Sequence, residues 1–215
     1  MRHIVHDDPP QSIKDALRAQ PTPSNPTEAW KKFDSSEVRE KLWELQHGLC
    51  AYCERTLEIG PGCSSIDHVV PKSRVHSGTF RYTNLLLCGT DDNTCNLYKR
   101  GNYFEGADDT GRWREGFIDP TQPRSASSFA YKRDGLVIPS KTAVQDDARD
   151  TLEIVHLNFE DLKTHRRDYL NRIDAAIVSM ADQFDAIRVY LAGELTLGSL
   201  KPYYSAKLQH FSITA

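Results

Sequence analysis

The sequence predicts an α+β protein that is mainly helical and contains a small strand, strand, helix unit supported by zinc. Three observations lead to this fold class. Four cysteines form two pairs whose spacing suits one tetrahedral zinc: Cys50 with Cys53, and Cys88 with Cys95. Two short apolar segments after the first pair predict strands. Apolar residues recur at helical steps both before and after this region.

Composition and length narrow the class of protein. The 215 residues are 39% hydrophobic, which allows a real core in one domain, or in one domain with an extension. The first ten residues contain no apolar run fit for a signal peptide, and no later stretch approaches the length of a membrane span. Four of the five cysteines have metal-ligand spacing, which argues against a disulfide framework. We therefore expect a cytoplasmic protein without membrane contact.

Residues 1–33 are expected to form an N-terminal arm. Pro21, Pro23 and Pro26 break any long helix there, so we predict a short helix over residues 12–19 followed by extended chain. The arm leads to the first strongly periodic segment of the sequence.

That segment predicts a helix with a defined start and end. Asp34, with Glu37 three residues later, forms a capping box. Three apolar residues then line one helix face: Val38, Leu42 and Leu45. Gly48 ends the helix, which delivers the chain to Cys50.

The segment between and after the cysteine pairs predicts the strand, strand, helix unit. We expect one strand over residues 66–69, a second over 84–88 and a helix over 94–100. Asp67 and His68 would lie at the end of the first strand. Because neighbours in a strand point to opposite faces, one of them can coordinate a cation while the other addresses a different atom of the same substrate.

The remaining sequence divides into two parts. Residues 34–140 are expected to hold the central unit with a following loop and a hairpin, and residues 141–215 a helical C-terminal region. The hairpin strands are residues 128–131 and 136–138, joined through Asp134-Gly135.

Three helices are expected in the C-terminal region. The first covers about residues 142–155, and Asn158 and Asp161 would cap a longer second one. Apolar residues at three and four residue steps give the second helix a core face: Leu162, Tyr169, Ile173, Ile177, Met180, Phe184, Ile187 and Leu191. Pro202 begins the third, which is short.

The cysteines suit a structural zinc more closely than a set of small buried hydrophobic residues. A Cys-x2-Cys turn places the sulfurs of Cys50 and Cys53 on one side, and Cys88 and Cys95 supply the second half of the site. Six residues separate the second pair where such sites usually have two, so residues 89–94 must bulge out as a loop. Cys63 lies outside both pairs and is expected to be a free, buried thiol.

These motifs together resemble an HNH endonuclease of the ββα-metal type with a zinc-stabilised frame. The order is Cys-x2-Cys, Asp-His, Asn, Cys and Cys-Asn-x2-Lys. The segments Leu49-Cys-Ala-Tyr-Cys-Glu54, Asp67-His-Val-Val-Pro-Lys-Ser73 and Asn84-Leu-Leu are similar to a narrower group, the PtuB nuclease subunits of Septu-type antiphage systems. Such subunits also occur beside retrons and work with an ATPase, PtuA.

The resemblance implies roles for four polar residues. His68 would be the general base that takes a proton from the attacking water, a task that suits an imidazole. Asp67 and Asn96 would hold one catalytic Mg²⁺ or Mn²⁺ through oxygen. Asn84 would bridge the loop between the strands and fix the approach of His68. Asn96 could instead cap a helix, and Asn84 could be a turn residue.

Several basic residues could contact phosphate. Lys99, Arg100 and Lys72 are the first candidates, although Lys99 and Arg100 could equally form a solvated helix face. Four arginines of the C-terminal region could face nucleic acid or a partner: Arg166, Arg167, Arg172 and Arg188. Residues 91–93 could touch metal or substrate, but solvation at a loop tip is the simpler interpretation.

The expected function is hydrolysis of phosphodiester bonds in nucleic acid, with DNA favoured, by the nuclease effector of an ATPase–nuclease antiphage complex. An RNase acting on structured RNA such as tRNA and a zinc-ribbon binding module that does not cut are the alternatives. The net charge of −3 disfavours strong binding of nucleic acid by the whole chain, so charge must be local or a partner must help. No Gly-rich phosphate loop is present, so any ATP site lies on another chain, which residues 142–215 would dock.

Overall fold

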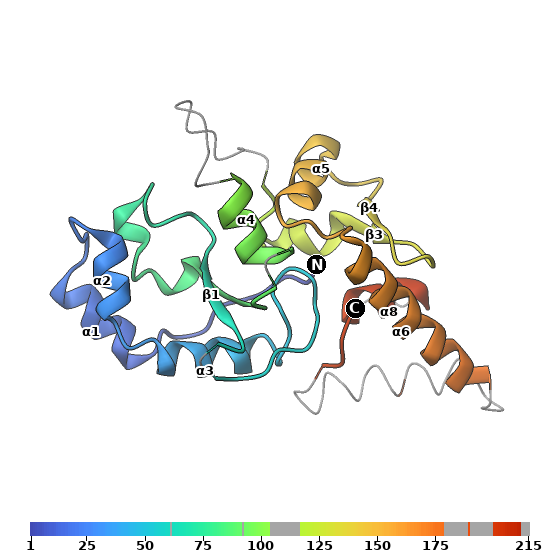
Figure 1. Cartoon of the computed structure of the whole chain (residues 1–215), viewed down its shortest axis with the longest axis horizontal. Coiled ribbons are helices and arrows are strands. Elements are labelled where there is room, and N and C mark those ends of the chain that lie inside the picture. Colours follow the sequence, from blue (N-terminus) through green and yellow to red (C-terminus); the bar gives the residue numbers. More distant parts are fainter. Residues whose placement is uncertain (61, 92, 104–116, 179–188, 190–199, 212–215) are drawn as a thin grey trace.

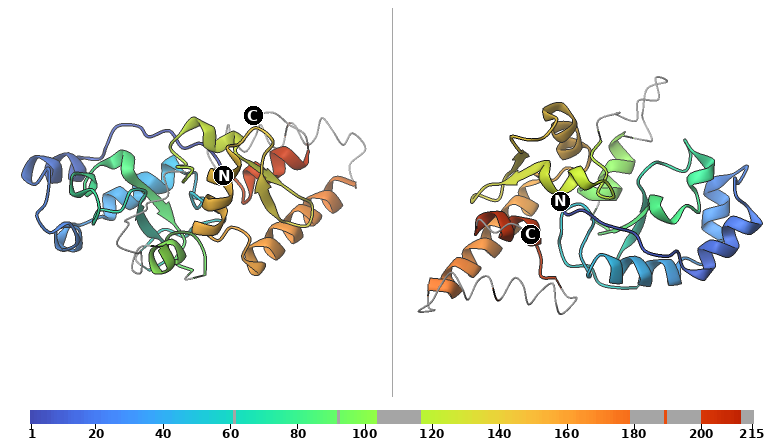
Figure 2. Two further views of the ribbon diagram at one scale, coloured as in Figure 1. Left: turned by 90° about the horizontal axis from the view of Figure 1, so that it is seen from above. Right: turned by 180° about the vertical axis from the view of Figure 1, so that it is seen from behind.

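The computed structural model describes residues 1–60, 62–91, 93–103, 117–178, 189 and 200–211. It confirms the α+β class, with helices around two separate two-stranded sheets. Figure 1 shows the N-terminal helices at one end, the first sheet near the middle, and the second sheet beside the last helices toward the other end. The two further views in Figure 2 show the same succession.

The N-terminal arm is more helical than the sequence analysis predicted. Helix α1 (Gln11–Ala19) is as expected, but α2 (Pro26–Lys32) occupies chain that was predicted to be extended. The side chain of Asn25 accepts a hydrogen bond from the Glu28 amide over 3.1 Å. Proline at the first helical position is tolerated because its missing N–H would be unpaired there anyway.

Helix α3 (Ser36–Leu45) ends as predicted, but its predicted capping box is wrong. The carboxylate of Glu37 accepts hydrogen bonds from the amides of Gln11 and Ser12, over 3.3 and 3.0 Å. Glu37 therefore caps α1 instead of its own helix. Gly48 follows α3 with a φ of 69°, the left-handed region in which glycine carries no Cβ penalty.

The predicted strand, strand, helix unit is present. Strands β1 (Ser65–His68) and β2 (Leu85–Cys88) pair antiparallel, with Asp67 opposite Leu86 and His68 opposite Leu85. Two 3-10 turns, η1 (His76–Gly78) and η2 (Tyr82–Asn84), lie in the connection, and α4 (Cys95–Tyr103) follows β2. The unit is drawn near the middle of Figure 1.

The second sheet is the predicted hairpin of β3 (Phe129–Tyr131) and β4 (Val137–Pro139), after the 3-10 helix η3 (Pro123–Ser127). Helices α5 (Gln145–Ile154) and α6 (Glu160–Val178) follow, and α8 (Tyr204–His210) is the last described helix. Asn158 does not cap α6 as predicted, because its side-chain amide makes two 2.8 Å hydrogen bonds to the backbone of Val137.

The C-terminal region packs on the central unit. The Cys95 amide donates to the Val155 carbonyl over 2.9 Å, and the Tyr203 amide donates to the Glu54 carbonyl over 3.0 Å. Leu49 joins an apolar cluster with Leu200 and Tyr204. The division predicted after residue 140 is therefore crossed by contacts close to two of the clustered cysteines.

Of the core face predicted for α6, Leu162 is buried and Tyr169 and Ile173 are half-buried, while Leu170, which was not assigned to that face, is buried as well. The predicted face residues Met180, Phe184, Ile187 and Leu191 lie outside the described chain. Arg166 also faces inward, donating to the Leu157 carbonyl over 3.3 Å and to the Gly135 carbonyl. It is therefore not a surface cation as predicted, and Arg188 lies outside the described residues. Among the described residues, no helix has the length and apolar character needed to cross a membrane.

Candidate functional site

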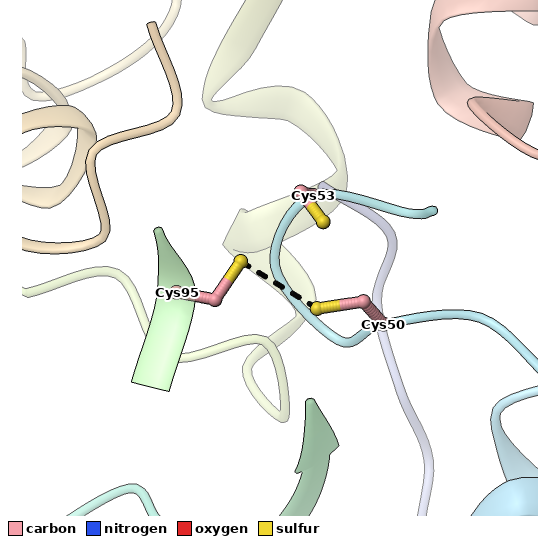
Figure 3. Close-up of side chains that lie close together, drawn as sticks. All are labelled: Cys50, Cys53 and Cys95. Carbon is pink, nitrogen blue, oxygen red and sulfur yellow. Dashed lines mark hydrogen bonds between the residues drawn. The ribbon is translucent and has the colours of Figure 1, made fainter. Parts of the chain in front are cut away.

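Three of the four predicted zinc ligands lie together. The sulfurs of Cys50, Cys53 and Cys95 all lie within 4.8 Å of one another, and all three residues are buried. Figure 3 shows Cys50 and Cys53 on one loop, and Cys95 approaching from the start of α4. The Cys50 and Cys95 sulfurs are 3.6 Å apart. Ligands about 2.3 Å from a tetrahedral zinc lie roughly 3.8 Å apart, so this separation fits the ion.

Cys88 is buried beside Cys50 but lies outside the group of three. Burial alone would raise the pKa of Cys50, but hydrogen bonds from the thiols of Cys53, Cys88 and Cys95 hold it well below its ordinary value. One sulfur thus has three sulfur neighbours. A zinc ion would take the place of the thiol protons in such a cluster.

The loop predicted between Cys88 and Cys95 is present, and Cys63 is not the buried thiol expected. Cys95 begins α4 with a φ of 57°, after the loop, and its amide is bonded to Val155. Asp91 on the loop pairs with Arg55 over 3.2 Å, and residue 92 lies outside the described chain. Cys63 is exposed.

Asp67 is a buried carboxylate with two donors on the same oxygen. Its Oδ2 accepts a hydrogen bond from the Tyr52 hydroxyl over 2.5 Å and an ion pair from the Lys99 ammonium. Lys99 is 1% exposed, so it is not the solvated helix residue that was the alternative interpretation. In this structure the Lys99 ammonium forms an ion pair with Asp67, and its contact with a phosphate remains a prediction.

His68 is held by a backbone carbonyl and an aromatic ring. Its Nε2 lies 3.0 Å from the Thr79 carbonyl oxygen, and its ring lies edge-on to Trp30 with centroids 4.6 Å apart. Because a carbonyl only accepts hydrogen bonds, Nε2 carries the proton and Nδ1 carries the lone pair. Burial, with smaller contributions from the cations of Lys72 and Lys99, lowers the pKa of His68 to about 3, so the imidazole is neutral at physiological pH.

The two predicted asparagines have different environments. Asn96 is buried near the start of α4, and its amide nitrogen donates to Ser65 over 2.9 Å, which leaves its oxygen for another partner. Asn84 bonds the Val70 amide and carbonyl over 2.8 and 2.9 Å, and the Gly78 carbonyl over 3.2 Å. It therefore bridges the loop between β1 and β2, as expected.

One cavity brings most of the predicted site residues together. Its volume is about 320 Å³. The predicted residues that line it are Asp67, His68, Lys72, Asn96, Lys99 and Arg100. Thr27 of α2 lines it as well. Asn84 is not among the residues that line the cavity; its hydrogen bonds hold the loop between β1 and β2. Asp67 and Asn96 offer the hard oxygen ligands that suit Mg²⁺ or Mn²⁺.

Sequence analysis missed three residues that shape this site. Trp30 contacts His68 from the arm, and Tyr52 contacts Asp67 from the cysteine loop. Gln46 is fully buried and bonds the backbone of Leu87 in both directions and the carbonyl of Leu49. The Asn25-Pro26 pair is a typical helix start and could have predicted α2, the helix that carries Trp30. The other two contacts depend on long-range packing that no local pattern reveals.

Comparison with known proteins supports the resemblance to HNH endonucleases. No protein-family model matches the chain. The chain is similar to a Vibrio cholerae serotype O1 biovar El Tor protein described as the HNH endonuclease of retron Vc95, with 26% identity over 146 residues. The match covers 63% of this chain, and the chain spans 64% of that relative's length. This likeness confirms the predicted resemblance to an HNH endonuclease linked to retrons.

Proposed function

We propose that the protein is a metal-dependent HNH endonuclease with a zinc-supported ββα-metal core. The observation that carries the proposal is the cavity that brings Asp67, His68 and Asn96 together beside the cysteine cluster. The likeness to the retron Vc95 protein supports the same activity. A structural zinc on Cys50 and Cys53 with the later cysteine pair would fix the frame of the site.

The roles of the site residues follow from their geometry. His68 presents a neutral imidazole whose Nδ1 can take a proton from water, while the Thr79 carbonyl fixes the ring through Nε2. Asp67 and Asn96 would hold the divalent cation through their oxygens. When bound, the cation neutralises charge on the phosphate and stabilises the leaving oxygen. Lys72 and Arg100 line the same cavity and would orient the phosphate.

The proposal favours a nuclease over a binding module. A module that only grips nucleic acid has no need of a buried imidazole beside a carboxylate, whereas Asp67 and His68 are 4% and 6% exposed and line one cavity. The substrate is proposed to be DNA. RNA remains the second candidate, because the same chemistry attacks either polymer.

One cleavage assay tests this function. The full chain is incubated with labelled DNA and labelled RNA in Mg²⁺, in Mn²⁺ and in chelator, alone and with an ATPase encoded beside it. We expect cleavage of DNA that requires the metal and is lost in His68→Ala. His165→Ala, an exposed histidine of α6, is the matched control and should cut normally. Binding without cleavage in every condition would favour the zinc-ribbon module, and cleavage of RNA alone would favour the RNase.

We infer further that the chain is the nuclease effector of an antiphage complex with a PtuA-like ATPase, together with a retron. The Septu resemblance and the retron-linked relative support this. The C-terminal region is the proposed docking surface, but truncation is a poor test because Val155 holds Cys95. Arg172→Glu changes an exposed residue of α6, and Lys132→Glu is an exposed control on the hairpin. Loss of ATPase co-purification in the first variant alone is expected. Equal retention in both would place the docking surface elsewhere.

A further inference from the structure

A buried contact joins the cysteine loop to the catalytic carboxylate. Tyr52 stands between Cys50 and Cys53, and its hydroxyl donates to Asp67 Oδ2 over 2.5 Å. The Lys99 ammonium contacts the same oxygen and also donates to the Tyr52 hydroxyl over 3.2 Å. The exposed fractions of Tyr52 and Lys99 are both 1%, so both donors to Oδ2 are buried.

We propose that Tyr52 is a positioning residue that fixes the Asp67 carboxylate for the catalytic cation and thereby couples the zinc loop to the cation site. The inference rests on the proposed function, in which Asp67 is a cation ligand. With both donors on Oδ2, Oδ1 is the oxygen left to meet a cation from the cavity. A carboxylate held in one orientation binds a cation without first losing side-chain freedom.

The Tyr52 ring is itself fixed by the loop that carries it. The neighbouring Ala51 amide donates to the Leu87 carbonyl of β2 over 3.1 Å, and the ring meets Phe117 edge-on with centroids 6.0 Å apart. Cysteines on both sides of the tyrosine belong to the clustered group. A shift of this loop would therefore move the hydroxyl away from Asp67.

Tyr52 is the partner whose removal isolates the positioning effect. Loss of Lys99 would change the charge balance around Asp67, because the ammonium neutralises the buried carboxylate. Tyr52→Phe removes one neutral donor and keeps the ring that fills the space. Tyr82→Phe is the matched control, since Tyr82 is 3% exposed and its hydroxyl lies 3.5 Å from Asp7, in the N-terminal arm.

The first test measures Mn²⁺ binding to the full chain by electron paramagnetic resonance, without nucleic acid. We expect Tyr52→Phe to keep its zinc and to bind Mn²⁺ about 10- to 100-fold more weakly. This is the usual effect of removing a group that hydrogen-bonds to a metal ligand. Tyr82→Phe should match the wild type. Affinity within twofold of wild type in a zinc-containing Tyr52→Phe protein would overturn the positioning role. A wild type that binds no Mn²⁺ would overturn the proposed function and the inference with it.

A second measurement uses only the wild-type protein, in case the variant does not fold. Coupling between two sites is reciprocal, so a filled cation site should also hold the zinc loop. We expect saturating Mg²⁺ to lower the equilibrium transfer of zinc from the protein to pyridylazoresorcinol. Zinc transfer that is unchanged by Mg²⁺ would overturn the coupling.

Discussion

Removing the Asn84 side chain should loosen the loop that carries Thr79 and slow cleavage. The side chain makes three hydrogen bonds to the loop, two to Val70 and one to Gly78. At about 1 kcal/mol of net stability for each bond, Asn84→Ala should cost about 3 kcal/mol. Val70 is partly exposed, so water can replace some of this loss, whereas the contact to Gly78 is buried. For a chain of this size the melting temperature should fall by roughly 6–12 °C.

Asn158→Ala is the matched control for this experiment. Asn158 bonds the amide and carbonyl of Val137 in the same two-bond pattern, but on the β4 hairpin strand. Urea unfolding should show a lower free energy of unfolding in both variants than in the wild type. Single-turnover cleavage, measured where both variants are folded, should fall only in Asn84→Ala, because Thr79 follows Gly78 and its carbonyl holds His68. Equal cleavage by the two variants, or a loss of stability below 1 kcal/mol in Asn84→Ala, would refute this reasoning.

Three further predictions concern the metal and the general base. Metal analysis should find one zinc per chain, and replacing any one of the four predicted ligands, Cys50, Cys53, Cys88 and Cys95, should unfold the core, so a folded preparation free of zinc would contradict the site. His68→Ala should cut about 100-fold more slowly or worse while keeping fold and zinc, and near-normal activity would remove His68 from the mechanism. Trp30→Ala should lower kcat by about 2- to 10-fold, the scale of one aromatic contact, with Trp30→Phe restoring most of it. Equal losses in the two Trp30 variants would exclude the ring contact.

The central unit could be predicted because its signals are local. Cysteine spacing and two short apolar runs specify the order of strand, strand and helix without reference to the rest of the chain. The errors arose where one local pattern has two solutions. The Asp34 and Glu37 spacing is the same whether Glu37 caps its own helix or α1, and only the packing of α1 decides. Prolines marked the arm as extended, yet Pro26 begins α2.

The solvated-face interpretation of Lys99 failed for a different physical reason. It assumed an exposed ammonium, whereas the hydrogen-bond partners of Lys99 are 32 and 47 residues away in the sequence. Arg166 is a similar case, because its guanidinium bonds carbonyls at Gly135 and Leu157. Buried charges depend on tertiary partners, so helix periodicity alone cannot identify them.

The pairing of Lys99 with Asp67 bears on how the protein can hold its substrate. The chain carries a net charge of −3, and the Lys99 ammonium at the site already faces a carboxylate. Lys72 and Arg100 also line the cavity, and two phosphate contacts would give log K a slope of only about −1.8 against log salt. Binding through so few contacts is weak. A divalent cation on Asp67 would add positive charge at one phosphate, but not along the rest of the strand. The remaining affinity for nucleic acid must therefore come from surfaces outside this cavity. Under the proposed function, an ATPase partner would provide such a surface.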